Sequence, residues 1–407
     1  MMKQKGFAKV WTLVLLSVMG APPAHSGGRG NPVEAPDLLA KQTLNKATAF
    51  LRTKQSADGA WRSETYGLLK SGQSLTPFVL FALTDSLADN RQPSEQAIQK
   101  AIAFLRTRSD PNGVHGRADP DFLDYPNYST AYALRCFLRF GNERDRARIE
   151  KMTSYLEAQQ FSEKVGFEPN SPAYGGWGFG INGRPTLSSF VDLSHTRRVL
   201  ASLAQANPVN PKVRIRAERF LALLQKSPKE KRSPLIPGFT NEITGQPPHD
   251  GGFFSSPNVA YANKGRTEVD PKTGHTFYRS YATATCDGIL SLLALGVDKS
   301  DPRITSAINW LRDNDDWNLP GGIPLDDPAP WAESMRFYHL MVRAETYSAL
   351  DMPGDWRKDL LKALSGKQLP DGSFLNSEGR LMKEDDPLLC TAFAVIALRH
   401  AFAATDG

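Results

Sequence analysis

The 407-residue sequence is poor in cysteine and has no long apolar run beyond its first 26 residues. Its 3 cysteines, Cys136, Cys286 and Cys390, are too few to build a disulfide framework. All of them fall in apolar helical stretches, so we expect them to be buried as small hydrophobic side chains. No later segment reaches the roughly 18 uninterrupted apolar residues of a membrane-spanning helix. We therefore expect no membrane span once the leader described below is removed.

A strong excess of charge is also missing. Lys and Arg number 49 against 43 Asp and Glu, and Lys3, Lys5 and Lys9 lie in the leader. A balance this slight excludes the basic surface that binds nucleic acid, and we expect no nucleic-acid partner. Apolar residues make up 40% and charged residues 23%, which indicates a folded globular chain and excludes an intrinsically disordered one.

Residues 1–26 have the pattern of a secretory signal peptide. Three lysines precede an apolar stretch from Val10 to Met19, which is too short to span a bilayer. Ala24-His25-Ser26 then places small residues at the cleavage positions before Gly27. The pattern predicts an exported protein, periplasmic or secreted, that starts with a flexible segment over 27–39. An uncleaved membrane anchor is the alternative.

An internal repeat with six copies is the most informative feature. Each copy opens with apolar residues at helical spacing and continues with a Gly-containing turn that carries an aromatic residue in most copies. In the first copy, Leu44–Leu51 is followed by Gln55 and by Asp58-Gly59-Ala60-Trp61. In the sixth, Leu360–Leu364 is followed by Gln368 and by Asp371-Gly372-Ser373-Phe374. The other turns contain Asn112-Gly113, Tyr174-Gly175-Gly176-Trp177, Asp250-Gly251-Gly252-Phe253 and Pro320-Gly321-Gly322.

A second helical segment that is apolar on most sides follows each turn. A helix of this kind belongs in the interior, whereas the opening helix has one polar face and belongs outside. Six outer and six inner helices predict an all-α fold, an (α/α)6 toroid, over residues 40–402 as one domain, with a short tail at 403–407. The inner segments lie around 77–83, 131–140, 199–203, 289–295, 337–350 and 388–398.

The order helix, Gln, Asp-Gly-x-aromatic resembles the prenyltransferase and squalene-oxidase repeat, or QW motif. This repeat is shared by squalene-hopene cyclases and the β subunits of protein prenyltransferases. The resemblance covers residues 40–402 and implies a terpenoid-cyclase-like double ring of the exported bacterial type, whose activity is unassigned. Because one fold supports many chemistries, the site has to be argued from its own residues.

The acid motif that class II terpene cyclases use, Asp-x-Asp-Asp, is not intact at the start of any inner helix. Asp313-Asn314-Asp315-Asp316 matches literally but follows an outer helix, where we interpret it as a solvated turn. At a matching inner-helix start, Asp192 keeps the first acid of the motif, but Ser194 stands where the proton donor would be. The zinc site of protein prenyltransferases is also not intact: Arg279 and Tyr281 stand at two of its ligand positions, and Cys390 is the one potential ligand of three. We expect no metal and no cofactor.

A site is expected in the central cavity, at the mouth where the inner helices begin. Helix N-termini carry partial positive charge and free N–H groups, so acids and polar ligand groups gather there. The alternative is that these acids only cap helices and that the histidines are hydrogen-bonded core residues. The catalytic candidates are Asp192, His195, Asp287, His339 and Asp386, and the ligand-binding candidates are Tyr132, Tyr281, Thr285 and Tyr338.

The longest interval between two successive copies of the repeat contains an insertion at 227–280. It is rich in Pro, Gly and polar residues but also carries aromatic ones, which is typical of a lid and unusual for a disordered loop. We expect it to cover one mouth of the ring.

Three functions remain open at this point. The first is an exported enzyme that acts on an isoprenoid-like or apolar small molecule in the cavity. The second is a non-catalytic binding protein for a lipid, glycan or peptide. The third is a glycan lyase or hydrolase, which would need acidic side chains placed close together.

Overall fold

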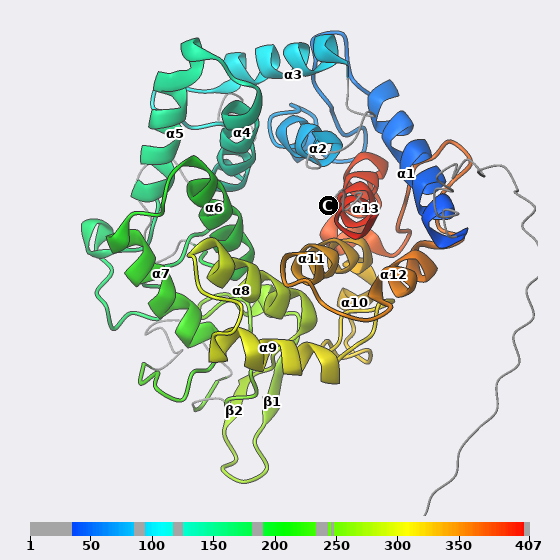
Figure 1. The fold of residues 1–407 in the computed structure, drawn as a ribbon. Coiled ribbons are helices and arrows are strands. Elements are labelled where there is room, and N and C mark those ends of the chain that lie inside the picture. Colours follow the sequence, from blue (N-terminus) through cyan, green and yellow to red (C-terminus); the bar gives the residue numbers. More distant parts are fainter. Residues whose placement is uncertain are drawn as a thin grey trace, which may run out of the picture.

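The computed structural model describes residues 35–84, 94–116, 125–180, 190–232, 243–245 and 248–402. These residues form two concentric rings of helices (Figure 1). The predicted signal peptide, the tail after Phe402 and part of the insertion lie outside the described residues.

The outer ring contains the amphipathic opening helix of each repeat. Each of these helices turns its apolar stripe inward and leaves its basic and acidic residues in water. They are α1 (Ala35–Thr53), α3 (Glu95–Arg108), α5 (Arg146–Ala158), α7 (Pro211–Leu224), α9 (Pro302–Asp313) and α12 (Trp356–Leu364).

The inner ring contains the second helix of each repeat. Each inner helix packs against the next one, and α13 packs against α2, so the ring is closed. This confirms the predicted all-α (α/α)6 toroid. The inner helices are α2 (Leu75–Thr84), α4 (Pro126–Phe140), α6 (Leu193–Ala206), α8 (Ala282–Ala294), α11 (Arg336–Ala349) and α13 (Pro387–Phe402).

In four of the six units, the repeat glutamine ties the unit to the next one. Gln368 donates from Nε2 to the carbonyl oxygen of Gly372 in its own turn, at 3.0 Å, and to that of Thr43 in α1, at 2.9 Å. The last repeat is thereby bonded to the first. Gln55, Gln160 and Gln225 make the corresponding pairs of bonds. The glutamine of the repeat thus links units of the ring and takes no part in the cavity.

The turn glycine allows the units to approach closely. Gly372 has φ +90°, and a Cβ atom built there would lie 2.4 Å from the carbonyl oxygen of Lys46 in α1. Any side chain would therefore collide with the neighbouring outer helix and would also be strained by the left-handed backbone.

The insertion carries the only strands among the described residues. β1 (Thr267–Val269) pairs antiparallel with β2 (Thr276–Tyr278), with Glu268 opposite Phe277, and the hairpin projects outside the ring next to α9 (Figure 1). The remaining short elements are α10 (Trp331–Ser334), η1 (Gly67–Leu69), η2 (Glu143–Asp145), η3 (Glu163–Val165), η4 (Ala260–Ala262) and η5 (Gly379–Met382).

Two smaller expectations can be compared with the structure. The first outer helix begins at Ala35, five residues before the predicted start of the ring, because Pro36 and Asp37 suit the first turn of a helix. Cys136, Cys286 and Cys390 are free and buried, as expected. Within the described ranges, no helix is long and apolar enough to cross a bilayer.

Candidate functional site

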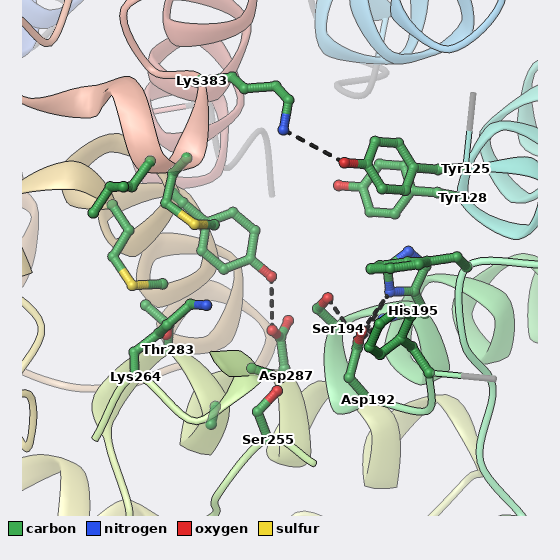
Figure 2. A pocket seen from close by; sticks show the side chains of 18 of the residues that line it. Tyr125, Tyr128, Asp192, Ser194, His195, Ser255, Lys264, Thr283, Asp287 and Lys383 are labelled. Carbon is green, nitrogen blue, oxygen red and sulfur yellow. Dashed lines mark hydrogen bonds and ion pairs between the residues drawn. The ribbon is translucent and has the colours of Figure 1, made fainter. Parts of the chain in front are cut away.

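A cavity of about 490 Å³ opens where the inner helices begin, and all six inner helices contribute to its wall (Figure 2). Its size falls within the roughly 300–1,000 Å³ of small-molecule sites. Most of the lining is apolar or aromatic and includes Leu75, Phe78, Tyr128, Phe179, Phe190, Met335, Leu389 and Phe393. The insertion covers part of the mouth with Ser255, Val259, Tyr261, Ala262 and Lys264.

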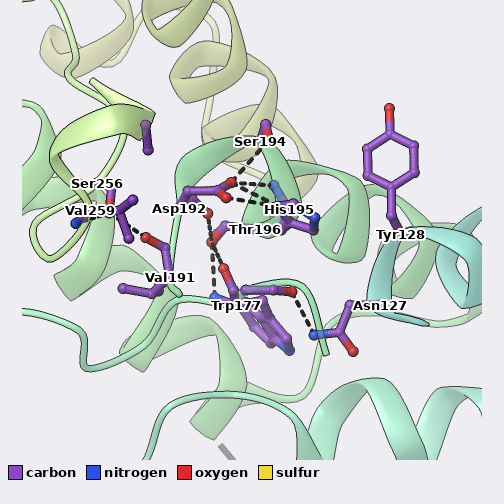
Figure 3. Close-up of polar contacts among 12 residues, drawn as sticks. Asn127, Tyr128, Trp177, Val191, Asp192, Ser194, His195, Thr196, Ser256 and Val259 are labelled. Carbon is purple, nitrogen blue, oxygen red and sulfur yellow. Dashed lines mark hydrogen bonds and ion pairs between the residues drawn. The ribbon is translucent and has the colours of Figure 1, made fainter. Parts of the chain in front are cut away.

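Asp192 is held rigidly at the N-terminus of α6 (Figure 3). Its backbone N–H donates to the carbonyl oxygen of Trp177, at 3.1 Å, and its own carbonyl oxygen accepts from Thr196 Oγ1, at 2.7 Å. The carboxylate accepts the backbone N–H of His195, at 2.9 Å, and the Ser194 hydroxyl, at 3.0 Å. Asp192 therefore caps a helix, which was the alternative to a catalytic role in the sequence analysis.

The same carboxylate also binds the imidazole of His195. Asp192 Oδ2 lies 2.8 Å from His195 Nδ1, while Nε2 has no hydrogen-bond partner among the described residues. The ring lies within an aromatic cage, with centroid distances of 4.7 Å to Phe179, 5.7 Å to Tyr128 and 6.1 Å to Tyr125. The carboxylate favours the tautomer with hydrogen on Nδ1, which leaves the Nε2 lone pair free.

The acid of this dyad is ionised. Burial by itself raises the pKa of Asp192, but the charge of His195 and the hydrogen bonds from His195 and Ser194 outweigh it, so the net pKa is lowered. An ionised carboxylate on Nδ1 stabilises the imidazolium that forms when Nε2 takes up a proton.

Asp287 on α8 is the second acid of the cavity, and its environment differs. It accepts a hydrogen bond from the Tyr338 hydroxyl of α11, at 2.7 Å, and lies 3.8 Å from Arg198 Nη1 and 4.0 Å from Arg197 Nε. Burial raises the pKa of Asp287 to about 7, because these partners offset only part of the cost of a buried charge. Near neutral pH this group exists in both protonation states.

Tyr338 is positioned by an acid beneath the start of its own helix. Glu384 accepts the backbone N–H groups of Phe337, at 2.9 Å, and of Tyr338, at 2.7 Å. It also accepts from the side-chain amide of Asn376, at 2.8 Å. Burial raises the pKa of Glu384 to about 7. Glu384 therefore fixes the N-terminus of α11 and, through it, the hydroxyl that faces Asp287.

A buried arginine packs against three tyrosine rings at the cavity. The Arg198 guanidinium is 5.7 Å from the Tyr128 ring centroid, 6.0 Å from that of Tyr132 and 5.7 Å from that of Tyr338. Its Nε donates to the Tyr128 hydroxyl, at 3.2 Å. Arg198 thus contacts three tyrosine rings, of which Tyr128 and Tyr338 line the cavity.

Two lysines line the cavity near its mouth. Lys264 Nζ lies 3.8 Å from the Trp331 ring centroid. Burial lowers the pKa of Lys264 to about 8, although the charge of Asp192 partly opposes this. Lys383 Nζ is 3.4 Å from the Tyr125 hydroxyl, which is a weak contact (Figure 2). It also lies over the rings of Tyr66 and Tyr125.

The structure brings five of the nine candidates together. Asp192, His195, Asp287, Tyr281 and Tyr338 all line the cavity. Tyr281 donates from its hydroxyl to the carbonyl oxygen of Ala262, at 2.9 Å, and so ties the insertion to the start of α8.

The other four candidates lie outside the cavity lining and make structural contacts. Thr285 accepts the backbone N–H of Phe253, at 3.1 Å, and His339 Nε2 is 2.8 Å from the carbonyl oxygen of Asp316. Asp386 caps α13 by accepting the N–H groups of Leu388 and Leu389, both at 3.0 Å. Tyr132 packs its ring on Phe78 and Phe81. All four therefore contact backbone groups or core side chains.

The sequence analysis missed Tyr125, Tyr128, Lys264 and Lys383. Lys383 lies shortly before the start of an inner helix, so its position carried a usable signal. Lys264 lies in the middle of the insertion, where no pattern in the sequence places it at the mouth. Within the described residues, no group of three or more His, Cys, Asp or Glu side chains has the arrangement of a metal site.

Comparisons with known proteins support the fold. No protein-family model matches the chain, and no curated protein matches its sequence. Among solved structures, a variant of the type II terpene cyclase MstE from Scytonema is similar with a TM-score of 0.51 at 16% identity, covering 90% of this chain and 99% of that one. A D-mannose isomerase gives a TM-score of 0.54 at 14% identity, covering 91% and 100%.

A third similar structure is an unsaturated glucuronyl hydrolase specific for heparin, with a TM-score of 0.51 at 13% identity and coverage of 90% and 96%. At these identities the likeness concerns the fold alone, a terpenoid-cyclase-like α/α toroid. The three neighbours carry out different reactions on this fold, so the chemistry of this chain has to come from its own cavity.

Proposed function

We propose that this protein is an enzyme that transfers protons to and from an isoprenoid-like or otherwise apolar small molecule bound in the central cavity. His195 is the general base and acid, and Asp192 orients it and stabilises its charge. The observation that carries the proposal is the arrangement of this dyad in the wall of an aromatic cavity, in which Nδ1 is held by an ionised carboxylate and Nε2 is buried without a hydrogen-bond partner among the described residues.

The cavity lining supports an apolar substrate. Phe78, Phe179, Phe190 and Phe393 offer ring faces to an alkyl or isoprenoid chain, and the acids and lysines lie where a polar end would be held. The MstE structure holds geranylgeranyl dihydroxybenzoate as its substrate, which agrees with a molecule of this kind. Alkene protonation of the class II type is not proposed, since Ser194 stands at the donor position.

The proposed reaction class is an isomerisation that begins at a C–H bond. Nε2 of His195 removes a proton next to an unsaturated or carbonyl group, and the electron pair moves into the conjugated system. The imidazolium, or Asp287 in its protonated state, returns a proton elsewhere on the same molecule.

Deuterium incorporation provides the test. Farnesal and geranylgeranial, whose γ-protons a base can remove, are incubated with the protein in D2O and analysed by mass spectrometry. We expect deuterium in the aldehyde with the wild type and a loss of at least roughly a hundredfold in rate with His195→Gln. His275→Gln, at an exposed hairpin position, serves as the matched control.

One outcome would favour a non-catalytic binding protein instead. If the aldehydes bind but acquire no more deuterium with the wild type than with His195→Gln, the cavity is a binding site and the enzyme proposal fails.

We also propose that the protein acts outside the cytosol, on the basis of the signal-peptide pattern in residues 1–26. N-terminal sequencing of the protein isolated from its natural host should start at Gly27. An intact N-terminus in the cytosolic fraction would contradict this proposal.

A further inference from the structure

The charged groups that line the cavity are not balanced. Both acids are already compensated, Asp192 by His195 and Asp287 by Tyr338, Arg197 and Arg198. These contacts occupy both carboxylates, although the charge of Asp192 still acts on Lys264.

Within the described residues, neither Lys264 nor Lys383 forms an ion pair with a carboxylate. Their contacts there are a backbone carbonyl, a tyrosine hydroxyl and aromatic rings. Aromatic faces hold an ammonium group in place without neutralising it. Two half-buried positive charges therefore border a cavity whose remaining surface is mostly apolar.

Lys383, which is the C-cap of η5, and Tyr125 both have a left-handed backbone at this mouth. Lys383 has φ +61° and Tyr125 has φ +42°, and they are two of five non-glycine residues with positive φ in the described part of the chain. Such conformations cost of the order of 1–3 kcal/mol each and are found where function requires a side chain at a particular place. Here they bring Lys383 Nζ to the Tyr125 hydroxyl.

We propose that the ligand of this cavity is an amphiphilic anion whose carboxylate or phosphate head is bound by Lys264 and Lys383, while its apolar tail lies among the phenylalanines. This inference rests on the proposed function for the apolar nature of the tail and adds the chemistry of the head. An anion at the mouth supplies the counter-charge that both lysines lack, and a charge-assisted hydrogen bond is stronger than a neutral one.

Matched ligands with one tail and different heads test the head group. Farnesol, farnesoic acid and farnesyl monophosphate are titrated into the full-length protein by calorimetry at pH 7. We expect the acid, the phosphate or both to bind at least about tenfold more tightly than the alcohol. Preference for one of the two would identify the head as a carboxylate or a phosphate.

Variants assign the preference to the two lysines. Lys264→Met with Lys383→Met should reduce the anions to the affinity of farnesol and leave farnesol unchanged, whereas Lys→Arg at both sites should keep a preference. Lys212→Met, on the exposed face of α7, is the control for loss of a surface charge. Circular dichroism melting verifies that each variant is folded.

Two results would overturn the inference: farnesol binding as tightly as both anions, or an anion preference that survives in the folded double methionine variant. The test measures binding alone and does not depend on proton transfer. A failure here therefore leaves the enzyme proposal standing, and a failure of deuterium incorporation leaves the head-group preference standing.

Discussion

Asp192 and Asp287 line the same cavity, yet their surroundings move their pKa values in opposite directions. Asp192 has a histidine, a hydroxyl and a helix N-terminus beside it, and its pKa is lowered. Asp287 has burial as its main influence, and its pKa is raised to about 7. The neighbours of an acid decide whether it stays ionised or holds a proton, and two acids that differ in this way can serve as the two ends of a proton transfer.

The largest effect is expected from Asp192→Asn. Asparagine is also a good helix cap, so α6 should form, but it does not stabilise a charged imidazole or fix its tautomer. We expect deuterium incorporation into farnesal to fall by roughly a hundredfold, with a melting temperature within a few degrees of the wild type. Asp386→Asn is the matched control, since Asp386 caps α13 without lining the cavity. Equal losses of activity in both variants would contradict the difference between the two caps.

The pH dependence of stability should separate the two acids next. In the folded protein Asp287 keeps its proton up to about pH 7, whereas the ordinary pKa of an aspartic acid is 3.8. The contribution of Asp287 to stability is therefore present below pH 4 and declines as the pH rises to 7. For Asp192 the sign is reversed, because its lowered pKa gives stability above the ordinary value that is lost on acidification.

Thermal melts between about pH 2 and pH 8 measure this difference, because the contribution of Asp192 is lost only below its ordinary pKa. Asp287→Asn should remove the decline in melting temperature towards pH 7. Asp192→Asn should remove part of the loss of melting temperature at acid pH. Unchanged slopes in both variants would show that neither acid titrates as the structure indicates.

A smaller effect is expected from Tyr338→Phe. The hydroxyl of Tyr338 favours the charged form of Asp287, so its removal should raise the pKa of Asp287 further. The loss of one buried hydrogen bond should lower stability by about 1–3 kcal/mol. Chemical denaturation at pH 6 and pH 8 gives the size, and the decrease should be larger at pH 8, where more Asp287 is ionised. A larger decrease at pH 6 would speak against this pairing.

The smallest effect is expected from Asp386→Ala. It removes the cap of α13 and should lower stability by about 1 kcal/mol, measured by chemical denaturation. Deuterium incorporation at a temperature well below the melting point should stay at the wild-type rate. A loss of incorporation in the folded variant would return Asp386 to the catalytic candidates.

The fold could be predicted because the repeat is a local pattern. Gln368 and Gly372 act within one turn and on the next helix. The helix and the glycine turn recur in all six copies and the glutamine in four, so the copies together define the ring. The site was predicted in part. Asp192 and His195 are three residues apart on one helix start, and that spacing is visible in the sequence.

The other four candidates show the limit of such reasoning. Thr285, His339, Asp386 and Tyr132 lie near inner-helix starts in the sequence, as Asp192 does, but the rotation of each helix turns their side chains towards backbone or core. A rotation of this kind is set by packing between helices from distant repeats.

The alternation of amphipathic and apolar helices was thus sufficient to define a closed double ring, because burial of an apolar face depends on nearest neighbours along the chain. The chemistry of the cavity was decided only when distant segments met. Tyr338 of α11 donates a hydrogen bond to Asp287 of α8. Lys264 lines the cavity from an insertion that has no repeat pattern. Charge compensation and pKa depend on distances in space, which no local sequence pattern contains.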